Sequence, residues 1–240
     1  MEPNEPQSAP HTSEESGEDR VGTVLKSEGD AVLEDQKPLF IVDFTIADIL
    51  TLSGHGLVWA AFWNAIHDNL GYALSLLLLA TLIDALDGKL ARSLDIARPF
   101  GRYLGSFVDL INYTVVPPVI LWRLGYNGPD ALFVMFLYST CGLLRLSRFN
   151  EVGNIEHKGG LAYLGLPVFW IHFVVIGLLM CRMRMGYQDF RIVTTIALLS
   201  LGTAFLLNRP FWKPQRYGLI AVIMLGLAAW FAFLGKYLSI

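Results

Sequence analysis

Three aspartates in apolar surroundings are the residues of this 240-residue chain that are best suited to chemistry. Asp84 and Asp87 follow the apolar run Leu-Leu-Leu-Leu-Ala-Thr-Leu-Ile, and Asp109 lies within the next apolar segment. Residues three apart share one face of a helix, so Asp84 and Asp87 are predicted to point the same way. Charged side chains in a membrane segment are costly and usually functional. We therefore take these three carboxylates as the candidate reactive centre.

Small residues extend the two surfaces that carry the aspartates. They are Gly88 and Ala91 on the first surface, and Gly101 and Gly105 on the second. Small residues at helical spacing allow close helix approach or open a groove. The connection at about residues 93–100 is short enough to pair the two segments as an antiparallel hairpin. This pairing would bring Asp109 to face Asp84 and Asp87.

Three carboxylates at one membrane depth repel one another unless cations neutralise them. Ligand sets made of oxygen alone suit Mg²⁺, Mn²⁺ or Ca²⁺ rather than zinc. A hard divalent metal in turn suits a phosphate substrate, and nearby guanidinium groups suit the same anion. The arginines in question are Arg92, Arg98, Arg102, Arg145 and Arg148. The sequence thus predicts a metal-assisted site for a phosphate compound.

The composition indicates the elements that must hold this site. The chain is 54% hydrophobic and 16% charged, with a mean hydropathy of +0.48, whereas a soluble domain carries roughly a quarter charged residues. Seven apolar segments have about the length of a membrane-spanning helix. They are 44–66, 70–91, 101–122, 130–149, 161–182, 190–207 and 217–238. We expect an all-α polytopic membrane protein, a bundle of about six to eight transmembrane helices.

Two of these segments contain features that could interrupt a helix. Asp48 and the Ser53-Gly54-His55-Gly56 stretch could divide the first segment into an interfacial piece and a spanning piece. Pro117 and Pro118 lie within the third segment and are expected to kink it.

Basic residues are divided unevenly between the two sets of turns. One set holds ten, namely Lys89, Arg92, Arg98, Arg102, Arg145, Arg148, Lys158, Arg209, Lys213 and Arg216. The opposite set holds four, namely Arg123, Arg182, Arg184 and Arg191. Because cytoplasmic loops carry the excess of Lys and Arg, the first set is expected to be cytoplasmic, together with the N-terminus and the aspartate site.

The chain divides into an acidic tail, residues 1–38, and an apolar body, residues 39–240. The tail holds ten acidic and three basic residues, a net charge of −7, and its composition is typical of disorder. It lacks the basic start and apolar core of a signal peptide. It could be a regulatory or partner-binding arm, or a solvated extension, and its composition favours the latter.

Two function classes are disfavoured by the composition of the whole chain. The net charge of −3 argues against a nucleic-acid-binding domain. A secreted disulfide scaffold is excluded, because Cys141 and Cys181 are the only cysteines and both lie in apolar runs.

The spacing of the site residues resembles a known family signature. The chain reads Asp84-x2-Asp87-Gly88-x2-Ala91-Arg92-x8-Gly101-x3-Gly105-x3-Asp109. This resembles D-x2-D-G-x2-A-R-x8-G-x3-D-x3-D, the signature of the CDP-alcohol phosphotransferases. Seven of the eight fixed positions match, and every spacing is kept.

The resemblance implies a chemistry and a set of partners. It implies an all-helical membrane fold, a homodimer, and Mg²⁺ or Mn²⁺ held by Asp84, Asp87 and Asp109. It further implies attack of an alcohol on the β-phosphate of CDP-diacylglycerol, with release of CMP and with Asp109 accepting the hydroxyl proton. The expected location is a prokaryotic cytoplasmic membrane.

The same resemblance assigns residues to the substrates. These are Thr51, Gly88, Ala91, Arg92, Gly101, Arg145 and Arg148. Gly88 and Ala91 would leave space for the cytidine side of the donor. Arg92 and Arg148 would bind phosphate or the carboxylate of the acceptor.

A second stretch resembles one branch of this family. Residues 141–150 read C-G-L-L-R-L-S-R-F-N, and residues 164–167 read L-G-L-P. They resemble the C-G-x-x-R-L-A-R-F-N and x-G-x-P segments of the bacterial and archaeal phosphatidylserine synthases. The resemblance covers about residues 44–170 and implies L-serine as the acceptor alcohol.

The chain departs from the family pattern at two positions. Gly105 stands where the family has a shared aspartate ligand, and Asp48 stands where the family usually has asparagine. Asp48, or Asp95 in the turn, could supply a replacement carboxylate. Three hypotheses remain: an active phosphatidyltransferase, a non-catalytic homologue that binds CDP-lipid or a partner, and a transporter with an intramembrane cation site. A transporter would not explain the signature spacing, and the paired broken helices of that class are absent from the sequence.

Overall fold

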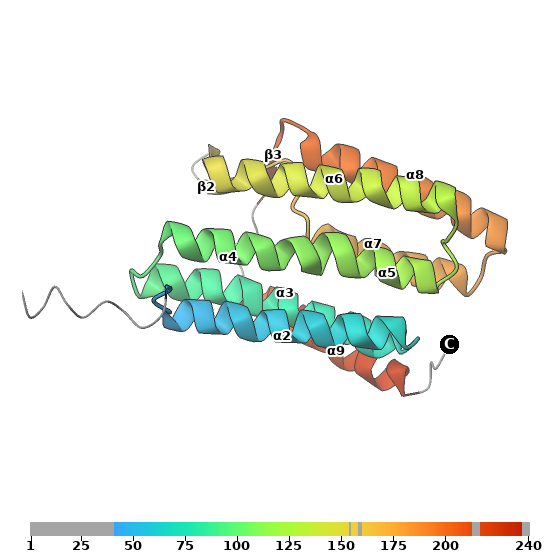
Figure 1. The fold of residues 1–240 in the computed structure, drawn as a ribbon, viewed down its shortest axis with the longest axis horizontal. Helices are drawn as coiled ribbons and strands as arrows, with labels where there is room; N and C mark the ends of the chain where they lie inside the picture. Colours follow the sequence, from blue (N-terminus) through green and yellow to red (C-terminus); the bar gives the residue numbers. More distant parts are fainter. Residues whose placement is uncertain (1–40, 154, 158–159, 213–216, 237–240) are drawn as a thin grey trace, which may run out of the picture. The chain divides into compact units, whose positions relative to one another are not determined.

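Helices make up most of the part of the chain that the computed structural model describes, which is residues 41–153, 155–157, 160–212 and 217–236 (Figure 1). The helices are α2 (Ile46–Ile66), α3 (Leu70–Ser93), α4 (Pro99–Asp109), α5 (Val116–Arg123), α6 (Pro129–Val152), α7 (Trp170–Arg182), α8 (Tyr187–Leu206) and α9 (Tyr217–Gly235). A π-helix, η1 (Leu110–Val115), joins α4 to α5. The predicted acidic tail, residues 1–38, lies outside the described residues.

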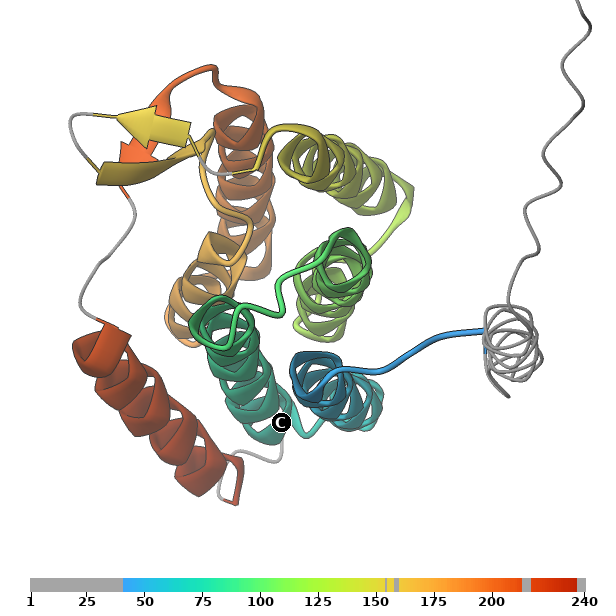
Figure 2. The same ribbon diagram turned by 90° about the vertical axis from the view of Figure 1, so that its left-hand side faces the viewer.

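The expectation of an all-α polytopic membrane protein is confirmed. Within the described ranges, five helical segments are long and apolar enough to cross a membrane: α2, α3, the continuous α4–η1–α5 segment, α6 and α8. The apolar helices α7 and α9 are shorter. In the body of the protein, α2 and α9 pack along α3, and α6 packs along α8, as the end-on view in Figure 2 shows.

The predicted helical span 161–182 is wrong in its first half. Residues Gly160–Leu164 form strand β2, which pairs antiparallel with β1 (Ile155–His157) and β3 (Pro210–Trp212) in a sheet of order β1-β2-β3. The helix starts only at Trp170. Gly165 adopts a positive φ of 75°, and Pro167 disfavours helical backbone in the residue before it. Helical geometry therefore cannot extend back across this stretch.

The first segment is one continuous helix, α2, despite its Ser-Gly-His-Gly stretch. Thr45 caps its start: the Asp48 amide donates to Thr45 Oγ1 at 3.3 Å, and the Thr45 amide donates to the Asp48 carboxylate at 2.8 Å. This reciprocal arrangement is a capping box. Gly54 faces α3, where a Cβ would stand 3.1 Å from the Ile83 Cγ2 atom. The glycine thus serves close helix packing rather than a break.

The two prolines of the third segment lie in the first turn of α5, and the π-helix η1 comes directly before them. Proline has no amide hydrogen to donate to the carbonyl four residues earlier. Pro117 and Pro118 therefore leave the carbonyls of Tyr113 and Thr114 without their usual helical donors. The expected irregularity is present, and it takes the form of a π-turn.

Helix α6 supplies the missing donors to this turn. The Tyr138 hydroxyl donates to the Tyr113 carbonyl at 2.7 Å, and the Ser139 hydroxyl donates to the Thr114 carbonyl at 2.8 Å. Tyr138 is 1% exposed, so its bond is shielded from competing donors. Buried carbonyls need such partners, and these two bonds fix α6 against the π-turn.

Two arginines form ion pairs at the end of the bundle that holds the α2–α3 turn and the start of α6. Arg123 at the end of α5 pairs with Asp68 between α2 and α3, and Arg191 of α8 pairs with Asp130 at the start of α6. The hydrogen bond from Arg123 holds the pKa of the Asp68 carboxyl below its ordinary value. Basic residues at this end therefore join turns to helices.

We predict that Gly71→Ala destabilises the bundle, because α9 packs directly against the Gly71 backbone of α3. A Cβ on Gly71 would stand 2.6 Å from the Gly235 Cα and 2.8 Å from the Phe231 carbonyl oxygen. Overpacking of this kind costs about 1–3 kcal/mol. Thermal unfolding in detergent is the measurement, and Gly226→Ala is the matched control, because its Cβ would meet nothing within 4 Å. Equal melting temperatures for the two variants would contradict the prediction.

Candidate active site

One cavity of about 530 Å³ lies at the end of the bundle where α3 ends and α4 begins. Its volume is within the range of small-molecule sites, about 300–1,000 Å³. Residues of α2, α3, α4, η1, α6, β2 and α9, and of the segment that leads into α7, line it. The charged residues in its lining are Asp48, Asp84, Asp87, Asp109, Arg92, Arg98, Arg102 and Arg145. Four acidic and four basic side chains thus share one cavity.

The three aspartates of the signature are brought together as the hairpin prediction requires. Asp84 and Asp87 stand on α3, and Asp109 ends α4. Asp87 is 8% exposed and accepts a hydrogen bond from the Thr51 hydroxyl of α2. The Tyr113 hydroxyl is within hydrogen-bonding reach of Asp84. Asp109 Oδ1 is buried and has no hydrogen-bond partner among the described residues.

These carboxylates do not by themselves form a complete metal-coordination site in the described part of the chain. Among the described residues, no three histidine, cysteine, aspartate or glutamate side chains are already arranged to hold one ion. Mg²⁺ is usually bound by one or two carboxylates together with water and substrate phosphate oxygens. The donor set of the cavity, with its unpartnered Asp109 oxygen, fits an ion that is completed by a phosphate ligand.

Arg145 of α6 is the most enclosed basic group in the cavity. It is 6% exposed, and its guanidinium carbon lies 5.1 Å from the Phe149 ring centre and 5.7 Å from the Tyr163 ring centre. The Nε atom is buried and makes no hydrogen bond to a described residue. Cation–π contacts hold the guanidinium in place while its donors remain available to an anion.

An ion pair between α2 and the α3–α4 connection closes another side of the cavity. Arg98 Nη2 lies 2.5 Å from Asp48 Oδ2, and Asp48 is 2% exposed. The carboxylate of Asp48, a candidate replacement metal ligand by sequence, lies in this ion pair and in the α2 capping box. Asp95, the other candidate, is exposed and is not part of the cavity lining.

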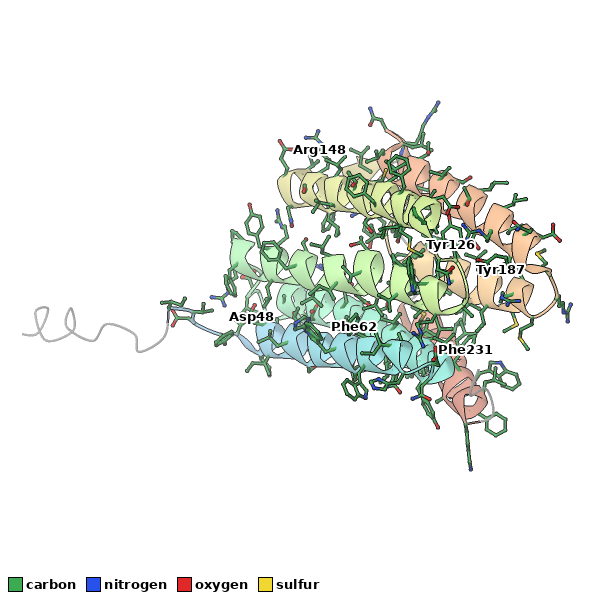
Figure 3. All side chains as sticks on the ribbon, turned by 45° about the vertical axis from the view of Figure 1, so that its right-hand side comes forward. Asp48, Phe62, Tyr126, Arg148, Tyr187 and Phe231 are labelled. Carbon is green, nitrogen blue, oxygen red and sulfur yellow. The ribbon has the colours of Figure 1, made fainter. Side chains whose placement is uncertain are left out.

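The predicted substrate-binding residues fall into two groups. Those that line the cavity are Thr51, Gly88, Ala91, Arg92, Gly101 and Arg145. Arg148 is not in the lining. It is exposed on α6, where Figure 3 labels it, and pairs with Glu151 at 2.5 Å. Of the two arginines in the C-G-L-L-R-L-S-R-F-N stretch, the structure therefore brings only Arg145 to the aspartates.

Several lining residues were missed by the sequence analysis. Thr81 and Tyr113 lie one helical turn from Asp84 and Asp109, respectively, and both line the cavity. Helical spacing could have found them. Tyr163 could not be found in this way, because its segment was predicted to be helical and is a strand.

The fold and the charged cavity define an integral membrane protein with a polar site at one end of its bundle. The family model for CDP-alcohol phosphatidyltransferases matches residues 44–235. The chain therefore belongs to the CDP-alcohol phosphatidyltransferase family.

Curated relatives point to one branch of this family. The CDP-diacylglycerol–serine O-phosphatidyltransferase of Mycobacterium bovis is 29% identical over 180 residues, which are 70% of this chain and 63% of the relative. The enzyme of the same name from Bacillus subtilis is 31% identical over 110 residues, 45% of this chain and 60% of the relative. Archaetidylserine synthase of Methanothermobacter thermautotrophicus is 32% identical over 127 residues, 51% of this chain and 52% of the relative. The chain thus spans about 63% of the length of its mycobacterial relative.

We predict that Arg98→Ala destabilises the protein and that Arg148→Ala does not. Removal of Arg98 leaves the buried Asp48 carboxylate with only its Thr45 partners, at a cost of about 1–3 kcal/mol. The Arg148–Glu151 pair is exposed at 58% and 69%, and surface pairs contribute about 0–1 kcal/mol. Melting temperatures of the two variants in one detergent measure the difference. Equal losses would show that the Asp48 pair is no more important than a surface pair.

Proposed function

We propose that this chain transfers the phosphatidyl group of CDP-diacylglycerol to the hydroxyl group of a small alcohol, with L-serine favoured, and releases CMP. Membership of the CDP-alcohol phosphatidyltransferase family supports the reaction class. The names of the mycobacterial and Bacillus relatives support CDP-diacylglycerol and serine as the substrates.

The observation that carries the proposal is the convergence of Asp84, Asp87, Asp109 and Arg145 on one cavity. The acidic and basic side chains in the lining balance in number, so a bound pyrophosphate would add uncompensated negative charge. Cations bound beside the aspartates would offset that charge. The same cavity supplies arginine donors for anionic oxygen atoms.

Asp84, Asp87 and Asp109 are the residues that would hold Mg²⁺ or Mn²⁺ together with the pyrophosphate. When bound, such a cation stabilises negative charge that develops on phosphate oxygens. The Thr51 hydroxyl donates to Asp87, and the Tyr113 hydroxyl is within reach of Asp84. The Thr51 bond restricts the Asp87 carboxylate to one orientation, as partners of metal-binding carboxylates commonly do.

The reaction is a displacement at the phosphorus atom that carries diacylglycerol. The serine hydroxyl oxygen forms a bond to this phosphorus, and the bond from the phosphorus to the CMP oxygen breaks. The hydroxyl proton passes to the Asp109 carboxylate, whose Oδ1 atom has no partner within the described chain. CMP leaves with the electron pair of the broken bond.

Arg145 supports an acceptor that carries a carboxylate. Its planar guanidinium can donate two parallel hydrogen bonds to a carboxylate. The Phe149 and Tyr163 rings hold that plane beside the cavity. Serine has such a carboxylate, whereas glycerol and inositol do not. Arg92, at the end of α3, remains for the phosphates.

Gly105 supports a second candidate, a homologue that binds CDP-lipid or a protein partner without turnover. A Cβ at this position would meet nothing within 4 Å, so the family's third aspartate would have room. Its absence leaves three signature carboxylates in place of four. Measured release of CMP decides between an active phosphatidyltransferase and a homologue without turnover.

We also propose that the protein is a homodimer in the cytoplasmic membrane of a prokaryotic cell. The cavity end of the bundle would then face the cytoplasm. Seven described basic residues lie at this end, namely Lys89, Arg92, Arg98, Arg102, Arg145, Arg148 and Arg209. The positive-inside rule supports the orientation. The homodimer rests on the family resemblance, and chemical cross-linking in membranes would test it.

The principal test is CMP release from vesicles that contain CDP-diacylglycerol. We expect release with L-serine and Mg²⁺ or Mn²⁺, little release with glycerol 3-phosphate or inositol, and none after EDTA treatment. Asp84→Asn should lower the rate by about 100-fold or more, as for the loss of a group that stabilises developing charge. Asp189→Asn is the control, because Asp189 is exposed on α8 and is not in the cavity lining. Full activity of Asp84→Asn would contradict the proposed site.

We predict that Gly105→Asp raises Mn²⁺ affinity and the rate of CMP release together. The new carboxylate would lie one turn before Asp109, in space that is open in the structure. Gly105→Ala fills the same space without charge and should change neither quantity. A wild-type protein that is active but impaired by Gly105→Asp would mean that three carboxylates form the complete site. Absence of CMP release from both proteins would favour the non-catalytic homologue.

Cysteine labelling in intact cells tests the orientation. In a variant without Cys141 and Cys181, Gln188→Cys at the opposite end should react with an impermeant maleimide. Ser93→Cys at the cavity end should react only after the membrane is permeabilised. Both residues are exposed in the structure. The reverse pattern would overturn the proposed orientation.

A further inference from the structure

His172 of α7 is a fully buried histidine that lies behind the cavity without lining it. Its Nδ1 atom is 3.0 Å from the Thr81 hydroxyl of α3, and its Nε2 atom is 3.3 Å from the Asn112 carbonyl oxygen of η1. Its ring centre is 5.1 Å from that of Tyr113. One side chain thus connects the two helical segments that carry the aspartates.

The partners of His172 determine which nitrogen carries the hydrogen. The Asn112 carbonyl can only accept, so Nε2 must donate. A neutral imidazole has a single N–H, which leaves Nδ1 to accept from the Thr81 hydroxyl. A cationic ring at a fully buried membrane position would be costly. The neutral tautomer with hydrogen on Nε2 therefore satisfies both contacts.

The Asn112 carbonyl depends on His172 because of the local chain geometry. In an α-helix its donor would be the Val116 amide, but in this π-turn that amide donates to the Ile111 carbonyl. The next candidate is Pro117, which has no amide hydrogen. The Nε2–H group of His172 replaces these donors. The Asn112 carbonyl thereby joins the two carbonyls that Tyr138 and Ser139 satisfy from α6.

The Thr81 contact differs, because Thr81 has a second acceptor. Its hydroxyl lies 3.0 Å from the Leu77 carbonyl oxygen of its own helix. If Nδ1 were removed, the hydroxyl could still donate to Leu77. Loss of His172 would therefore leave the Asn112 carbonyl without its hydrogen-bond donor, whereas the Thr81 hydroxyl would keep an acceptor.

We propose that His172 is a positioning residue: it holds the π-turn η1 in the geometry that directs Asp109 and Tyr113 towards Asp84. Asp109 immediately precedes η1, and Tyr113 lies within it, one turn further along. Release of the Asn112 carbonyl would free the turn and shift both side chains. A displacement of about 1 Å in a catalytic group can lower a rate by about 100-fold. The effect on turnover rests on the function proposed above.

Three substitutions separate the two contacts. H172Q places an amide nitrogen near the position of Nε2 and can still donate to the Asn112 carbonyl. H172N reaches only the Thr81 side and loses the Asn112 contact, and H172L loses both. Y126F is the matched control, because it removes a buried hydroxyl that lies 2.7 Å from Thr195 Oγ1 at the opposite end of the bundle.

Two measurements are made on each full-length variant in lipid nanodiscs. Steady-state kinetics should show kcat about tenfold lower or more in H172L and H172N, with KM for CDP-diacylglycerol and for serine within about twofold. H172Q should keep kcat within about threefold, since it retains the Asn112 contact. Hydrogen–deuterium exchange should be faster at residues 110–116 in H172L and H172N only. Y126F should leave both readouts at wild-type values.

The exchange measurement separates this proposal from the proposed function. One outcome is that the wild-type chain releases no CMP while residues 110–116 exchange faster in H172L and H172N but not in H172Q. In that case the proposed function fails and the positioning role is supported. Unchanged exchange in H172L and H172N overturns the role of His172, whatever the activity. Normal kcat in H172L and H172N, or equal loss of kcat in H172Q and H172N, also overturns it.

Discussion

The free-energy cost of placing several carboxylates inside an apolar helical bundle is the constraint on which the rest of the structure depends. Asp87 is stabilised by a hydroxyl from α2, Asp84 has a phenol within reach from η1, and Asp48 is paired with Arg98. Each partner comes from a different segment, so the acidic groups help to determine how the helices pack. Asp109 keeps a buried oxygen that meets no hydrogen-bond partner in the described part of the chain, which fits the group proposed to accept a proton.

The arrangement of the signature aspartates could be predicted because it depends on local geometry. Helical periodicity places Asp84 and Asp87 on one face, and a connection of a few residues between α3 and α4 returns Asp109 to the same depth. Thr81 and Tyr113 follow the same periodicity and were within reach of the same reasoning. Apolar length likewise identified every helical segment of the described body.

What could not be predicted depends on contacts between distant parts of the chain. Tyr163 reaches Arg145 through a strand whose sequence is apolar enough to resemble a helical span. Arg145 and Arg148 are three residues apart, yet only Arg145 lines the cavity. The paired prolines predicted an irregular helix, but not the donors from α6 and α7 that stabilise it. Sequence spacing carries no information about these donors.

The prolines after η1 have a consequence for how this protein can change in evolution. Each proline removes a backbone donor, and side chains of two other helices replace what is lost. The donors and the prolines therefore form an epistatic unit, whose substitution effects will not add. A proline replaced by alanine regains its amide and makes one side-chain donor dispensable. Lineages that keep the proline pair should retain the donors on the two other helices, and lineages without it are free to lose them.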